Sequence, residues 1–122
     1  MFLHTALQNT AQRSPDADAL VLTDNSSLSY RELLGLVNKC THQLHQLNLE
    51  PGARIGIYLP KHVLSAIAPF AISALSAVFV PINPLLTTAQ VRHIVADCGL
   101  SLLVTSPDRA KRLSTELKNF DL

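Results

Sequence analysis

The chain has 122 residues, which is enough for one domain with its own hydrophobic core. Hydrophobic residues make up 48% of it, charged residues 16%, and the formal net charge is +1, so the strongly basic surface of a nucleic-acid-binding protein is excluded. Cys40 and Cys98 lie far apart and outside any CxxC pattern. We expect two buried free thiols and a reducing, cytoplasmic location.

The chain begins with a predicted helix and a predicted β-hairpin. Apolar residues recur at helical spacing over residues 2–12, and Ser14–Pro15–Asp16 ends the pattern. The hairpin consists of a strand over residues 19–23, turn residues 24–27 and a return strand that begins at Leu28.

A longer amphipathic helix follows the hairpin. Ser29 and Glu32 form a capping box, which predicts that the helix begins there. Its apolar stripe predicts five buried side chains, namely Leu33, Val37, Cys40, Leu44 and Leu47. Pro51 and Gly52 then turn the chain.

The second half of the chain alternates apolar runs with helical patterns. The runs RIGIYL, AVFVPI and LSLLVT predict strands over residues 54–59, 77–82 and 100–105. Continuous apolar runs are typical of strands buried on both faces, and strands that alternate with helices form parallel sheets. We therefore expect one α/β domain over residues 1–122: a three-layer parallel sheet with helices on both faces and a peripheral β-hairpin.

The helices between these strands carry clear end signals. Thr87 and Gln90 form a second capping box, and Gly99 is placed to end that helix. Ser106 is placed to cap a last helix, with Pro107 at its first position, where proline is favoured.

Residues 63–82 are twenty uncharged residues, about the length that spans a bilayer. Pro69 and Pro81 would each remove a helical hydrogen bond, and the last six residues favour a strand. We expect a helix over 64–75 followed by a strand, and no membrane span. Pro69 is expected to kink this helix or to mark a late start.

No residue pattern predicts a catalytic, cofactor-binding or metal site. A phosphate cradle needs clustered glycines, and the four here are separated: Gly35, Gly52, Gly56 and Gly99. His42 and His45 have a spacing that can hold a metal, but no acidic or cysteine ligand stands beside them, so a solvated polar face is predicted. His62 and His93 are isolated and are expected at the surface, whereas His4 lies near a terminus, where mobility is expected. Asp97 and Glu116 have no marked partner.

Ligands of open parallel sheets gather at the carboxyl ends of the strands. Those ends are expected to present Lys61, Asn83, Thr105 and Ser106, and Lys61 could meet an anion there. The alternative is that these residues cap helices and make turns, and we favour that alternative because Ser106 already has a capping role.

The stretches LSYRELLGLVNKCTHQL, LEPGARIGIYLP, AVFVPINPLLT and VADCGLSLLVTS together resemble the start of AMP-forming ligases. This superfamily contains acyl-CoA synthetases, luciferases and adenylation domains of peptide synthetases. The likeness runs from about residue 5 to about residue 112. The sequences of the motifs are most similar to those of acyl-CoA ligases associated with exosortase A systems. Two positions depart from the family: Ala53 stands where aspartate is usual, and Ser76 where glycine is usual.

The resemblance implies that a carboxylate attacks ATP to give an acyl-adenylate, and that coenzyme A then displaces AMP. It implies ATP, Mg²⁺ and coenzyme A for the full-length enzyme. Its phosphate loop and catalytic lysine come later than residue 122, so this chain is expected to be a catalytically inactive opening piece that partners the missing remainder.

Two other functions stay open from the sequence: the opening of an amino-acid-activating adenylation domain, and a non-catalytic interaction module. Because faces that the remainder would cover are exposed in a shortened chain, we also expect self-association, as a homodimer.

Overall fold

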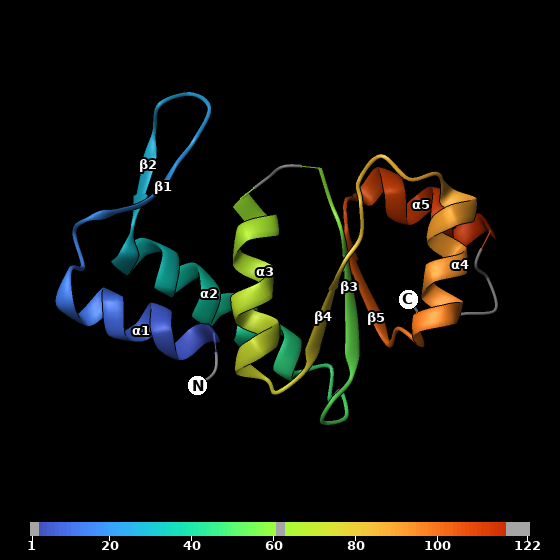
Figure 1. Ribbon diagram of the computed structural model, residues 1–122, viewed down its shortest axis with the longest axis horizontal. Helices are drawn as coiled ribbons and strands as arrows, with labels where there is room; N and C mark the ends of the chain where they lie inside the picture. Colours follow the sequence, from blue (N-terminus) through green and yellow to red (C-terminus); the bar gives the residue numbers. More distant parts are fainter. Residues whose placement is uncertain (1–2, 61–62, 117–122) are drawn as a thin grey trace.

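The computed structural model describes residues 3–60 and 63–116 and has the predicted order of elements. Figure 1 shows three layers, with the first three helices on one side of a central sheet and the last two on the other. The helices are α1 (Leu3–Arg13), α2 (Tyr30–His45), α3 (Val63–Ala74), α4 (Thr88–Cys98) and α5 (Pro107–Glu116). The strands are β1 (Asp18–Val21), β2 (Ser27–Ser29), β3 (Arg54–Tyr58), β4 (Val78–Pro81) and β5 (Leu102–Thr105).

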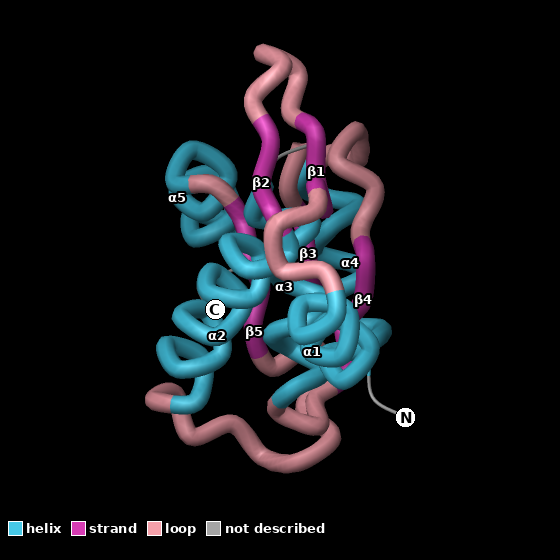
Figure 2. Tube along the Cα trace, turned by 90° about the vertical axis from the view of Figure 1, so that its left-hand side faces the viewer, coloured by secondary structure: helices cyan, strands magenta, loops and turns pink. Residues whose placement is uncertain are grey.

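The central sheet is parallel, with the strand order β4-β3-β5. Strands β1 and β2 form a separate antiparallel hairpin, which extends away from α1 and α2 (Figure 2). The predicted α/β architecture, a parallel sheet with helices on both faces and a peripheral hairpin, is therefore confirmed.

The central strand β3 divides the hydrophobic core into two clusters. Ile55 and Ile57 are buried in the cluster beneath α1, α2 and α3. Tyr58 belongs to the second cluster, with Val91 of α4 and Leu113 of α5. Because side chains alternate along a strand, β3 supplies apolar contacts to both faces and is the strand on which the two helical layers meet.

Gly56 lies in the middle of β3, at a very close approach. A Cβ atom built on it would lie 2.6 Å from Leu100 Cδ1, 2.8 Å from Leu103 Cδ1 and 3.2 Å from Ile82 Cδ1. The absence of a side chain at Gly56 is therefore what lets these three residues pack against the sheet.

Both predicted capping boxes are present. The Glu32 N–H donates to Ser29 Oγ at the start of α2, and the Gln90 N–H donates to Thr87 Oγ1 at the start of α4. Each helix therefore begins where its first-turn residues satisfy backbone groups that lack helical partners.

Helices α3 and α4 end in the same hydrogen-bond pattern. At the end of α4, Gly99 is left-handed with φ 61°, and the Leu100 N–H donates to the Val95 carbonyl at 3.1 Å. At the end of α3, Ser76 is left-handed with φ 58°, and the Ala77 N–H donates to the carbonyl five residues earlier at 3.2 Å. These are Schellman motifs, in which glycine is usual at the left-handed position. The departure at Ser76 therefore falls on a position that requires positive φ.

The second departure, Ala53, closes a tight turn. The Ala53 N–H donates to the Glu50 carbonyl at 3.0 Å across Pro51 and Gly52, and Gly52 has φ 76°. Proline followed by a left-handed glycine is the pattern of a type II turn. Ala53 is buried, so its methyl group belongs to the core.

Four expectations about burial and helix shape need correction. Leu47 is 52% exposed because α2 ends at His45 and the helical stripe does not extend to it. Cys40 and Cys98 are free thiols, but both are half-buried rather than buried. Helix α3 begins at Val63 and contains Pro69, so the proposed late start is wrong.

The strand AVFVPI is not buried on both faces. Val78 and Phe79 of β4 are 50% and 37% exposed, because β4 lies at an edge of the described sheet. Residues 63–82 form α3 and β4, and within the described part of the chain no helix has the length and apolar character needed to cross a membrane.

Candidate functional site

The carboxyl ends of the parallel strands are occupied by local structural contacts. The Asn83 side-chain oxygen accepts a hydrogen bond from the Leu85 N–H at 3.0 Å, which makes a turn after β4. Ser106 Oγ accepts from the Arg109 N–H at 3.4 Å and caps α5. Lys61, the proposed anion contact, lies outside the described residues. The turn and capping roles expected for Asn83 and Ser106 are thus present.

Tyr58 contacts several elements at this end of the sheet, and no sequence pattern had marked it as a candidate site residue. Its hydroxyl donates to the Leu86 carbonyl at 2.6 Å, and its own carbonyl accepts from Thr105 Oγ1 at 2.7 Å. Tyr58 is only 6% exposed. It therefore links the ends of β3 and β5 to the loop that enters α4.

Arg109 completes this cluster from the first turn of α5. Its guanidinium lies 4.3 Å from the centroid of the Tyr58 ring, a cation–π contact. Its Nη1 atom is buried and has no hydrogen-bond partner within the described residues. The arrangement places one permanent positive charge beside a buried aromatic ring.

The four glycines have separate structural positions and do not converge. Gly52 makes the turn before β3, Gly56 permits close packing in β3, and Gly99 ends α4. Gly35 lies inside α2. The backbone N–H groups that cradle a phosphate come from clustered glycines, so the described residues do not form a phosphate-binding loop.

The histidines form no metal centre in the described part of the chain. His42 and His45 are exposed on α2, and His42 Nε2 lies 3.3 Å from the side-chain nitrogen of Gln46. His93 and Asp97 are exposed on α4. Among the described residues, no group of three potential metal ligands occurs. His62 and the side chain of Glu116 are not among the described residues. His4, on α1, is half-buried.

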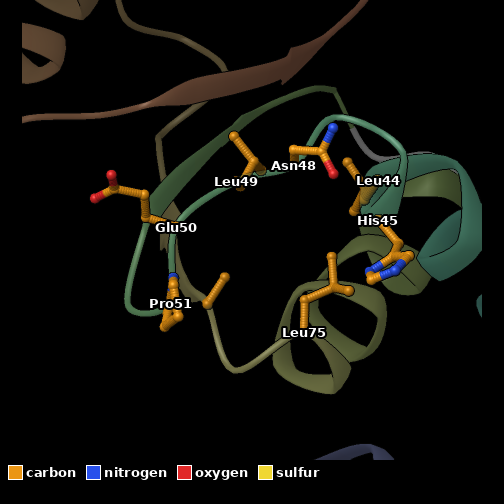
Figure 3. Close-up of a pocket in the computed structure, with 8 residues that line it drawn as sticks. Leu44, His45, Asn48, Leu49, Glu50, Pro51 and Leu75 are labelled. Carbon is orange, nitrogen blue, oxygen red and sulfur yellow. The ribbon is translucent and has the colours of Figure 1, made fainter.

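One hollow of about 330 Å³ lies at the opposite, amino end of the sheet (Figure 3). It is lined by residues of the end of α2, the following loop and the end of α3: Leu44, His45, Asn48, Leu49, Glu50, Pro51, Leu75 and Ala77. Figure 3 shows the Glu50 carboxylate pointing away from it. With mostly apolar walls and no carboxylate directed inward, the hollow offers packing space rather than catalytic groups.

A second hollow of about 480 Å³ separates the hairpin from the start of α3. Its lining includes Leu20 and Leu22 from the hairpin and Ala66 from α3. Asp24 lies at its rim, and hydrogen bonds from the Ser26 hydroxyl and N–H lower the pKa of its carboxyl. The Asp24 carboxylate is thus engaged in the hairpin turn.

Comparison with known proteins gives the family. The model of the AMP-binding enzyme family matches residues 7–121. The N-(5-amino-5-carboxypentanoyl)-L-cysteinyl-D-valine synthase of Amycolatopsis lactamdurans is 38% identical over 113 residues, which cover 91% of this chain and 3% of the synthase. The phosphinothricin tripeptide synthetase of Streptomyces viridochromogenes is 32% identical over 112 residues, covering 92% of this chain and 10% of the synthetase.

A solved structure has the same fold. The Mycobacterium tuberculosis fatty acyl CoA synthetase superposes with a TM-score of 0.85 at 24% identity, covering 96% of this chain and 23% of that one. The chain thus spans a small part of the length of the proteins that it matches. With a family match over nearly all of its residues, the chain belongs to the AMP-binding enzymes, the adenylate-forming superfamily of acyl-CoA synthetases and adenylation domains.

Proposed function

We propose that the chain is the N-terminal segment of an ATP-dependent, AMP-forming ligase. The observation that carries the proposal is the family match over residues 7–121, and the shared fold of a fatty acyl CoA synthetase supports it. In the proposed reaction, a carboxylate oxygen attacks the α-phosphate of ATP to give an acyl-adenylate and pyrophosphate. A thiol then displaces AMP and forms a thioester.

The described residues contribute structure rather than chemistry to this reaction. Gly52, Gly56 and Gly99 lie apart and have separate structural roles, so their backbone N–H groups do not converge on one point. The triphosphate and its Mg²⁺ therefore do not fit a site made by these residues alone. ATP, Mg²⁺ and coenzyme A therefore belong to the whole enzyme in this proposal. Taken alone, the 122-residue chain is proposed to be catalytically inactive.

Two classes of acid are candidates. The sequence motifs resemble those of acyl-CoA ligases, including ligases associated with exosortase A systems. The fatty acyl CoA synthetase shares the fold of this chain at 24% identity. The curated relatives at 38% and 32% identity are named as peptide synthetases or synthases. Activation of an amino acid is therefore at least as well supported as activation of a fatty or other organic acid. The free thiols Cys40 and Cys98 fit a reducing, cytoplasmic location for either class.

A graft tests the proposed function. Residues 7–121 replace the matching segment of the Mycobacterium tuberculosis fatty acyl CoA synthetase, and exchange of pyrophosphate into ATP is measured with a fatty acid. We expect exchange above that of a matched graft carrying Gly56→Val, which disrupts packing on β3. The same segment is also grafted into the Amycolatopsis synthase and assayed with its amino acids. If both grafts fold, as judged by circular dichroism, and neither exchanges pyrophosphate, the proposal is wrong.

Calorimetry tests the inactivity of the isolated chain. MgATP is titrated to millimolar concentration into the 122-residue protein, and no saturable heat is expected. Saturable binding would contradict the proposal, because it would show a nucleotide site made by this chain alone.

A further inference from the structure

The tip of the hairpin formed by β1 and β2 holds an asparagine in a left-handed conformation. Asn25 has φ 68° and an exposed side chain, and the small residue Ser26 follows it. The Asn25 N–H donates to the Leu22 carbonyl at 3.0 Å, and the Leu22 N–H donates to the Ser26 carbonyl at 2.7 Å. The tip is therefore a defined, hydrogen-bonded turn.

An exposed asparagine can react with the backbone nitrogen of the residue that follows it. The nitrogen loses its proton and attacks the asparagine Cγ, ammonia leaves, and a cyclic imide forms. Water then opens the imide to aspartate or isoaspartate, so the conversion consumes water and neither oxidises nor reduces the chain. A backbone nitrogen is a poor nucleophile while it keeps its proton, because resonance delocalises its lone pair. A group that holds this N–H therefore slows the reaction.

Asp24 holds the N–H that the attacking nitrogen would have to lose. The Ser26 N–H donates to Asp24 Oδ1 at 3.0 Å, and the Ser26 hydroxyl donates to the same oxygen. These hydrogen bonds lower the pKa of the Asp24 carboxyl, so it is ionised at neutral pH. A hydrogen bond to a carboxylate is stronger than one to a neutral acceptor, and the negative charge opposes removal of the proton.

We propose that Asn25 is a site of spontaneous deamidation and that Asp24 slows this reaction in the folded chain by holding the Ser26 N–H. The reacting groups and the carboxylate belong to three consecutive residues, so the reaction requires no contact with another part of the protein. Deamidation would place a second carboxylate beside Asp24, and isoaspartate would lengthen the backbone of the turn. Asp24 thereby preserves the short connection between β1 and β2.

The other asparagines in the described part of the chain are less suited to this reaction. Asn9 and Asn38 lie inside α1 and α2, where helical hydrogen bonds engage the following N–H. Asn83 is followed by proline, which has no N–H. Asn48 is exposed and left-handed, with φ 53°, but the larger side chain of Leu49 crowds the attacking nitrogen. Asn48 is therefore the matched comparison within the same chain.

Peptide mapping measures the rate of deamidation at each asparagine. The 122-residue chain is incubated in mildly alkaline buffer, in parallel with and without concentrated urea, and is then digested with trypsin. Cleavage after Arg13 and Arg31 gives a peptide in which Asn25 is the only side-chain amide, and a second peptide carries Asn48. Mass spectrometry should show that Asn25 reacts faster than Asn48 in urea, and more slowly in the folded chain than in urea. The proposal is wrong if Asn25 does not react in urea.

Asp24→Ala tests the role of the carboxylate. In the folded chain it should raise the rate at Asn25 roughly tenfold, because a hydrogen bond to a charged group is lost, whereas parent and variant should react alike in urea. Asp16→Ala is the matched control, since it breaks the 3.2 Å ion pair with Arg31 at the base of the hairpin and should leave the rate unchanged. An unchanged rate in Asp24→Ala, or equal acceleration by both variants, overturns the proposal. No readout depends on ATP, so the outcome is independent of the graft experiment.

Discussion

Ser76→Gly is expected to stabilise the chain, because Ser76 holds a left-handed backbone conformation with φ 58° at the end of α3. A residue with a Cβ atom pays about 1–2 kcal/mol for this conformation. Glycine avoids that cost but gives the unfolded chain more freedom, which costs about 0.4–1 kcal/mol. Taking the midpoints of these two ranges, the net gain in the free energy of unfolding is about 0.8 kcal/mol. Ser76 is exposed, so little packing is lost with its side chain.

Urea unfolding followed by circular dichroism measures this gain. For a chain of this size, it corresponds to a rise in Tm of roughly 2–4 °C. The matched control is the reverse change, Gly99→Ser, at the equivalent position of α4. A Cβ at Gly99 would meet nothing within 4 Å, so its cost is conformational. We expect the two changes to have opposite signs and to cancel approximately in the double variant.

The reasoning is refuted if Ser76→Gly lowers the midpoint of unfolding, or leaves it unchanged, while Gly99→Ser lowers it. The denaturant dependence of the free energy should stay the same in both variants. A change in that slope would indicate a change in the compactness of the native or the unfolded state.

Three further predictions concern the core and α2. Gly56→Ala should lower the free energy of unfolding by about 1–3 kcal/mol in urea unfolding, because its Cβ would lie 2.6 Å from Leu100 Cδ1; an unchanged midpoint would contradict the packing argument. Tyr58→Phe should lower it by about 1 kcal/mol through loss of the hydrogen bond to Leu86, and a neutral effect would show that this bond adds no net stability. Burial raises the pKa of the Cys40 thiol, so its contribution to stability is fully present below the unfolded pKa of about 8.5 and is lost as pH rises through the folded pKa. Cys40→Ala should remove this part of the pH dependence of unfolding, and an identical profile in the variant would contradict the shift.

The sequence predicted features that depend on neighbouring residues in the chain. Ser29 with Glu32 and Thr87 with Gln90 marked the starts of α2 and α4, because a capping box is a contact between residues three apart. Gly99 marked the end of α4 for the same local reason. The alternation of strands and helices was then sufficient to predict a parallel sheet.

Features that depend on distant residues were missed. The apolar run of β4 predicted burial, but its position at an edge is decided by which strands pair, and Val78 is half exposed as a result. The contact of Arg109 with Tyr58 joins α5 to β3, and no local pattern relates the two residues. At the strand ends, Asn83 and Ser106 were correctly expected to serve turns and caps, because those roles also depend on near neighbours.

The position of β3 at the centre of the sheet affects the order in which the chain can fold during synthesis. Strand β3 is made before both of its partners, and Thr105 hydrogen-bonds to Tyr58 across 47 residues of chain. At typical rates of translation, those residues take roughly 2–10 s to synthesise. During that time Ile55 and Ile57 can be covered on one side by α2, but the edge of β3 that receives β5 stays open. Until β5 is made, the edge of residues 54–58 that pairs with it has no partner strand, so this segment is available to a chaperone that binds extended apolar segments.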